Sequence, residues 1–76
     1  MAKLPVISGH ELIRVLQRDG FLIVRQRGSH VSLMRGQHKT VVPLHDELAR
    51  GTLLGILKQC GLSKEQLLNL PRKTIS

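Results

Sequence analysis

Aromatic residues are nearly absent from this 76-residue chain, which has no tryptophan, no tyrosine and a single phenylalanine, Phe21. Modules that bind single-stranded nucleic acid on exposed rings need several aromatic side chains, so the composition counts against that class. Cysteine is equally scarce, because Cys60 has no second cysteine with which to form an internal disulfide. No apolar run approaches the ~20 residues that span a bilayer, and the first residues show no signal-peptide pattern. These absences predict a cytoplasmic protein that does not bind membranes.

Acidic residues are also few, since five Asp or Glu stand against twelve Lys or Arg and the formal net charge is +7. A basic domain of this size is typical of proteins with a polyanionic partner. We therefore expect nucleic acid first and an acidic protein surface second. No segment resembles a recognition helix with base-reading side chains, which argues against DNA binding by this chain alone.

Two helices are predicted from capping signals and apolar spacing. Ser8 and Glu11 form a capping-box pattern that opens a helix over about residues 9–19. Thr52 is placed to cap a second helix, which ends at Gly61. Its apolar stripe consists of Leu53, Ile56, Leu57 and Cys60. We expect Gly55, in the middle of this helix, to allow close packing against a sheet.

Between these helices lie three runs rich in β-branched residues and separated by glycine-containing turns. They are residues 21–27, 30–35 and 38–42. A capping-box pattern at Ser63 starts a short helix that ends near residue 70. We expect a single α+β domain over residues 1–70, with helices on one face of a three-stranded antiparallel sheet. Residues 71–76 are predicted to form a flexible basic tail.

The turn Gly28-Ser29-His30 is the candidate site, because arginines flank it on both sides. Histidine can exchange a proton near neutral pH, and arginine binds phosphate in a fixed fork. If Val31 and Leu33 face the core, strand alternation makes His30 face outward. This combination points to chemistry on a phosphodiester.

The chain resembles the HicA toxins of HicA/HicB toxin–antitoxin systems, and the matching residues cover nearly all of it in order. The matching stretches are Leu4-Pro5 with Ser8-Gly9, Gly20-Phe21, Gly28-Ser29-His30, Val42-Pro43-Leu44-His45, and residues 51–63. The resemblance implies a double-stranded-RNA-binding-domain-like α-β-β-β-α fold. It also implies cleavage of mRNA without a metal, with His30 as the catalytic histidine. A HicB-like antitoxin is expected to cover the His30 face.

From the residues we expect His30 to act as a general base on a ribose 2′-OH. Gly28 is expected to set the geometry of the turn. The predicted RNA-binding residues are Arg25, Arg27, Ser29, Arg35 and Lys39. The proton donor to the leaving group stays open between His38, His45 and water.

Less specific interpretations stand beside this one. The spacing of His30, His38 and His45 matches no standard metal signature, so no metal or other cofactor is expected. Cys60 lies on an apolar stripe and is expected to be a small buried hydrophobe. The main alternative function is a non-catalytic RNA-binding module that recognises shape through phosphate and 2′-OH contacts. A third possibility is an interaction subunit whose basic face docks an acidic protein.

Overall fold

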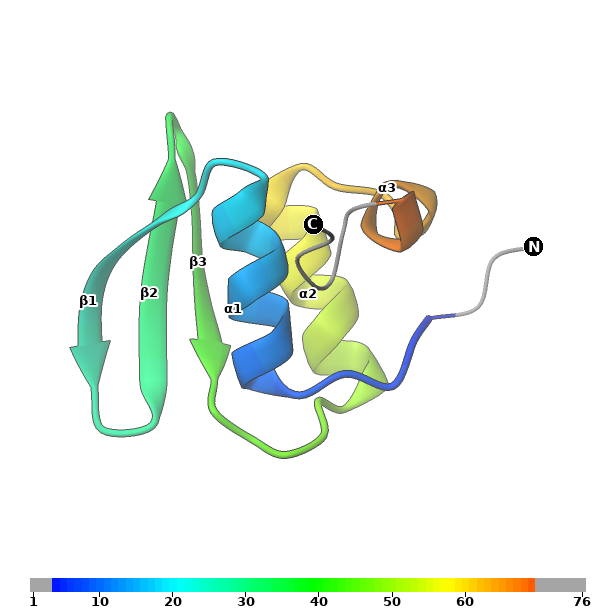
Figure 1. Cartoon of the computed structure of the whole chain (residues 1–76), viewed down its shortest axis with the longest axis horizontal. Helices are drawn as coiled ribbons and strands as arrows, with labels where there is room; N and C mark the ends of the chain where they lie inside the picture. The colour runs from blue at the N-terminus through cyan, green and yellow to red at the C-terminus, as the bar shows by residue number, and fades with distance from the viewer. Residues whose placement is uncertain (1–3, 70–76) are drawn as a thin grey trace, which may run out of the picture.

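The computed structural model describes residues 4–69 and shows a three-stranded sheet with helices on one side (Figure 1). The elements in chain order are α1 (Gly9–Arg18), β1 (Leu22–Arg27), β2 (His30–Arg35), β3 (His38–Pro43), α2 (Arg50–Cys60) and α3 (Lys64–Asn69). The predicted α+β class and the α-β-β-β-α order are therefore confirmed, with α3 as an additional short helix. The tail predicted for residues 71–76 lies outside the described residues.

Helix α1 begins where the capping box places it. The backbone N–H of Glu11 donates to Ser8 Oγ at 3.0 Å, and the Glu11 carboxylate accepts from the Ser8 N–H at 3.3 Å. These bonds satisfy donors that the first helical turn leaves unpaired. The helix then buries Leu12, Val15 and Leu16, and it ends at Arg18 with Asp19 as its C-cap, directly before Gly20.

The sheet has the order β1-β2-β3, and both neighbouring pairs are antiparallel. Along β2 the side chains of Val31 and Leu33 are buried, and Val42 of β3 lies buried opposite Val31. These residues join α1 and α2 in one apolar core. Every residue of β1 is exposed, while Phe21, which was expected to begin this strand, is buried immediately before it.

The predicted start of α2 is wrong, because the helix begins at Arg50 and its N-cap is Ala49. Leu48 is buried and its N–H donates to the Ile7 carbonyl, so the chain turns into the helix directly after this anchor. Thr52 consequently lies inside the first turn and caps nothing.

The packing role expected for Gly55 is also wrong. Gly55 is exposed, and a Cβ added to it would meet no atom within 4 Å. The buried stripe of α2 is the predicted one, Leu53, Ile56, Leu57 and Cys60, and it lies on the other side of the helix. The helix therefore packs on the sheet through its leucine and isoleucine side chains.

Helix α3 follows a second capping box, in which the Gln66 N–H donates to Ser63 Oγ at 3.1 Å. The Gln66 side-chain oxygen accepts from the Ser63 N–H at 2.7 Å, and Leu67 buries its side chain in the core. No helix within residues 4–69 is long and apolar enough to cross a membrane.

Candidate functional site

His30 is the first residue of β2 and lies on the sheet face turned away from the helices. Its neighbour Val31 is buried, whereas His30 is exposed and Ser32 and Met34 are half-buried. Because strand residues alternate between faces, His30, Ser32 and Met34 share the side without helices. We call this side the open face.

A two-residue turn, Gly28-Ser29, presents His30 to Arg27. Gly28 has φ +54°, whereas Ser29 has no positive φ, which is the pattern of a type II′ hairpin turn. The β1–β2 register closes the hairpin by setting Arg27 directly opposite His30. Opposed residues of an antiparallel pair point to the same face. The guanidinium-bearing side chain and the imidazole therefore both start from the open face, one strand apart.

A β-bulge in β1 adds Arg25 to the same face. The register shifts between Ile23, which lies opposite Leu33, and Arg25, which lies opposite Ser32, so that Val24 is the extra residue. Without a bulge, Ile23 and Arg25 would point to the same side. The inserted residue separates them, leaving Ile23 on the helix side and Arg25 on the open face.

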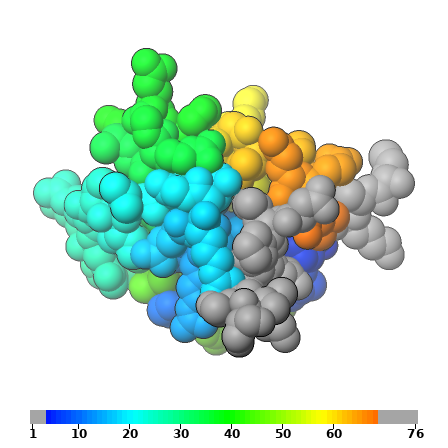
Figure 2. All heavy atoms as spheres, turned by 45° about the horizontal axis from the view of Figure 1, so that its top comes forward, coloured from blue at the N-terminus to red at the C-terminus, as the bar shows by residue number. Residues whose placement is uncertain are grey.

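Strand β3 completes the open face with Lys39 and Val41. Lys39 lies opposite Met34 and Val41 opposite Ser32, and both are exposed. The open face thus consists of Leu22, Val24, Arg25, Arg27, His30, Ser32, Met34, Lys39 and Val41. In the space-filling view the strands form one side of the molecule and α3 lies toward the other (Figure 2).

The His30 end of the sheet is fixed by the segment that follows β3. The Leu44 N–H donates to the carbonyl of Ser29 at 2.7 Å, and the Gly9 N–H donates to the carbonyl of His45 at 2.9 Å. Gly9 is buried so close to this segment that a Cβ would lie 2.0 Å from the Pro43 oxygen. The start of α1, the hairpin turn and the exposed His45 therefore converge at one end of the molecule.

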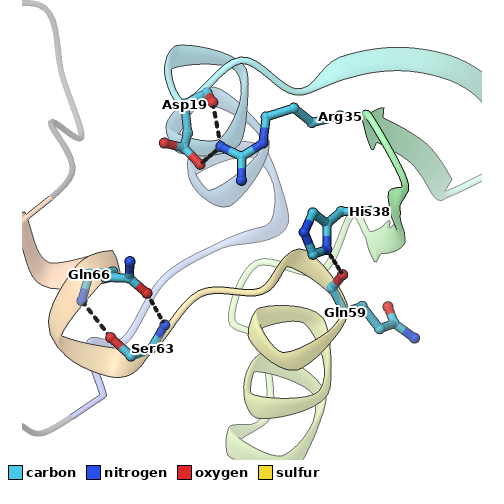
Figure 3. Close-up of polar contacts among 6 residues, drawn as sticks. All are labelled: Asp19, Arg35, His38, Gln59, Ser63 and Gln66. Atoms are coloured by element: carbon cyan, nitrogen blue, oxygen red, sulfur yellow. Dashed lines mark hydrogen bonds and ion pairs between the residues drawn. The ribbon is translucent and has the colours of Figure 1, made fainter.

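Arg35 and His38 are not part of this assembly. Arg35 and His38 lie opposite one another in the β2–β3 register, at the end of β2 away from His30. Their side chains turn toward the helices (Figure 3). Arg35 Nη1 donates to the Asp19 carboxylate at 2.5 Å, and His38 Nδ1 lies 3.2 Å from the Gln59 carbonyl oxygen. His38 is five residues from Pro43, the partner of His30, which corresponds to about 17 Å along a strand.

The remaining candidate residues have separate positions. Cys60 is fully buried, and burial raises the pKa of its thiol to about 11 although a hydrogen bond with Thr40 opposes this. It has neither the access nor the thiolate character of a nucleophile. His10 is exposed on the first turn of α1. Within residues 4–69, no group of three or more His, Cys, Asp or Glu side chains is arranged to hold a metal ion.

Sequence reasoning did not identify two contributors to the site. The first is Val24, whose bulge directs Arg25 to the open face. The second is Gly9, whose contact with Pro43 holds α1 against the end of β3. Bulges and close backbone contacts depend on the tertiary register, so apolar spacing alone carries no signal for them.

A family model described as the HicA toxin of bacterial toxin–antitoxin systems matches residues 9–62, which include both main helices, the whole sheet and His30. No curated protein matches the chain. Since the family match covers well over half of the 76 residues, the chain belongs to the HicA family and is a toxin of the toxin–antitoxin type.

Proposed function

We propose that this toxin is a metal-independent endoribonuclease that cleaves mRNA with His30 as its general base. The observation that carries the proposal is the direct pairing of His30 with Arg27 on the open face, at a turn inside the matched region. An exposed proton acceptor beside a phosphate-binding guanidinium suits a phosphodiester substrate. The cytoplasm, where mRNA is available, is the expected place of action.

The reaction begins with transfer of the ribose 2′-OH proton to the His30 imidazole. The 2′-oxygen attacks the adjacent phosphorus, and the bond from phosphorus to the 5′-oxygen breaks. The products are a 2′,3′-cyclic phosphate and a 5′-OH, once a proton has been delivered to the leaving oxygen. RNA supplies its own nucleophile, so the step requires neither a metal-activated water nor a covalent enzyme intermediate.

The cations of the open face bind the substrate backbone. Arg27 lies opposite His30 and is assigned to the scissile phosphate, where it offsets the charge that develops during attack. Arg25 and Lys39 are assigned to neighbouring phosphates, and Ser29 to a contact at the turn. Arg35 is left out of this set, because Asp19 holds its guanidinium on the other face.

The positions of His38 and His45 limit which of them can protonate the leaving 5′-oxygen. His38 belongs to the far end of β3 and to the helix side, so it is too distant to protonate the leaving oxygen. His45 remains a candidate proton donor, because Leu44, the residue before it, donates a hydrogen bond to Ser29 in the Gly28-Ser29 turn. We assign the proton to His45 or to a water molecule beside it.

The antitoxin is proposed to be a HicB-like protein that covers the open face. Net charge +7 favours an acidic partner surface, and the cations around His30 give that surface a target. An antitoxin docked there would block the mRNA and His30 together.

The test compares the wild type with His30→Ala, incubated with a long mRNA in the presence of EDTA, followed by sequencing of the product ends. We expect the wild type to cut and leave cyclic phosphates, and the variant to lose about 10²–10⁴ in rate while still binding RNA. His38→Ala is the control, since it removes a histidine from the opposite face. Equal cutting by His30→Ala would place the base elsewhere. Binding without cutting by the wild type would favour the non-catalytic RNA-binding module.

A further inference from the structure

A hollow of about 330 Å³ lies on the open face and extends to the helix side of β3, and Ser32 is its lining residue nearest to His30 along β2. Its apolar walls are formed by Val24 from the bulge, Leu33 and Met34 from β2 and Val41 from β3. Four polar residues also line it, Ser32, Lys39, Thr40 and Gln59. We propose that this hollow binds one base of the RNA, that of a nucleotide beside the scissile phosphate. The proposal rests on the proposed function for its link to cleavage, and it adds the subsite that would select the cutting position.

The register gives the hollow a suitable distance from the reacting atoms. Ser32 is two residues from His30 on the same face of β2, which corresponds to about 7 Å. This is a spacing that one nucleotide can bridge. A nucleotide whose phosphate lies between His30 and Arg27 can therefore direct its base toward Ser32.

The chemistry of the walls fits a base better than a phosphate. Val24 is 55% exposed and Val41 is 47% exposed, so each offers apolar surface to a flat ring. Ligand sites are commonly built in this way, from apolar walls with a few polar groups that fix orientation. The cations Arg25 and Lys39 flank these walls and are free to bind the phosphates on either side of the base.

The polar groups of the hollow predict which bases it favours. Thr40 Oγ1 donates to the side-chain oxygen of Gln59 at 2.7 Å, which leaves the amide N–H groups of Gln59 to donate to a ligand. Guanine, cytosine and uracil carry an exocyclic carbonyl oxygen that accepts such bonds, whereas adenine accepts them only at its ring nitrogens. We therefore expect adenine to be the weakest ligand.

The first experiment measures base binding without cleavage. Methyl-labelled protein is titrated with the four nucleoside 3′-monophosphates, and with ribose 5-phosphate as the ligand that lacks a base. We expect the nucleotides to shift the methyl signals of Val24, Met34 and Val41, and ribose 5-phosphate to leave them unchanged. Equal shifts with ribose 5-phosphate, or shifts confined to other residues, would overturn the proposal.

Val41→Phe is the main variant, because phenylalanine suits an exposed strand position and its ring would fill the hollow. We expect about tenfold weaker nucleotide binding, in line with the loss of one base contact. Leu54→Phe is the matched control on the exposed side of α2, and it should bind like the wild type.

The second experiment reads the bases around each cut in mRNA. The wild type should show one enriched position beside the cut, and Val41→Phe should lose the enrichment while Leu54→Phe keeps it. Enrichment that persists in Val41→Phe would overturn the subsite. If Val41→Phe loses only antitoxin binding and keeps nucleotide binding, the hollow is a protein-docking site instead. Should the wild type not cut at all, the proposed nuclease function fails, and the titration still decides whether the hollow binds a base.

Discussion

Arg35 and Asp19 join the second strand to the end of the first helix. Arg35 Nη1 donates to both the Asp19 carbonyl, at 2.9 Å, and the Asp19 carboxylate, at 2.5 Å. The guanidinium carbon also lies 4.9 Å from the centre of the Phe21 ring. This arginine therefore contributes to stability from the helix side of the sheet.

Arg35→Ala is expected to lower the free energy of unfolding by about 1–2 kcal/mol, because a charged hydrogen bond and a cation–π contact are lost together. The half-exposed position of the pair keeps the effect in this modest range. Urea titration measures it. Arg25→Ala serves as the control, since Arg25 is an exposed side chain of the open face. An unfolding midpoint equal to the wild type in Arg35→Ala would contradict this role.

Gly9→Ala and Gly55→Ala should change stability in opposite directions. A Cβ at Gly9 would lie 2.0 Å from the Pro43 oxygen, so α1 or β3 must move and the protein should lose more than about 2 kcal/mol. A Cβ at Gly55 meets nothing within 4 Å, and alanine is favoured in a helix interior by about 1 kcal/mol. Thermal unfolding of the two variants compares them directly. A stabilising Gly9→Ala would show that the close contact is not required.

The salt dependence of RNA binding should identify the cations that contact phosphate. Arg25→Ala and Arg27→Ala are each expected to reduce the slope of log K against log salt by about 0.7, the value for one phosphate contact on a single strand. These measurements use the His30→Ala background, in which RNA stays intact. Arg14→Ala, on the exposed side of α1, should leave the slope unchanged. A slope that falls equally in all three variants would indicate diffuse charge rather than a defined site.

His45→Ala should slow cleavage by about 10²-fold if His45 protonates the leaving oxygen. The deficit should largely disappear with an RNA whose leaving 5′-oxygen is replaced by sulfur, because a thiolate leaves without protonation. His38→Ala should cleave both substrates at the wild-type rate. A deficit of equal size on both substrates would show that His45 positions the turn and does not donate the proton.

Cys60 makes the stability of the protein sensitive to alkaline pH. Burial raises the pKa of its thiol from the ordinary 9.0 to about 11, so the folded state retains a proton that the unfolded state releases. The stabilisation is complete below pH 9 and is lost as the pH rises toward 11. Cys60→Ala should therefore lose less free energy of unfolding than the wild type between neutral pH and about pH 10. An equal loss in both proteins would assign the pH dependence to other groups.

The same burial predicts slow reaction of Cys60 with a thiol reagent. Modification of the native protein should proceed only as fast as the chain opens, and it should become rapid in urea. Rapid modification without denaturant would contradict the buried position.

The sequence alone predicted the order of the helices and strands, and it predicted which side chains of β2 face away from the core. The capping box at Ser8 fixed the start of α1, and alternation of Val31 and Leu33 with His30 correctly predicted which β2 side chains face outward. These signals are local, because a cap bonds within one turn and strand alternation has a period of two.

The features that could not be predicted depend on contacts between distant segments. The bulge at Val24 arises from the register of β1 against β2, and the Arg35 guanidinium lies on the helix side because Asp19 lies beside it in the folded chain. Thr52 looked like a cap because its hydroxyl suits one, yet the buried Leu48 starts the helix earlier. His45 is adjacent to the His30 turn through hydrogen bonds between residues far apart in sequence.

Strand β2 carries the site and the core in the same six residues, since His30 and Ser32 alternate with Val31 and Leu33. A genetic selection for cells that survive the toxin would therefore recover substitutions on both sides of this strand. On the role proposed for His30, substitutions there would give folded, inert protein that still accumulates. Those at Val31 and Leu33 would give protein that is degraded, and immunoblotting of the survivors would separate the two kinds.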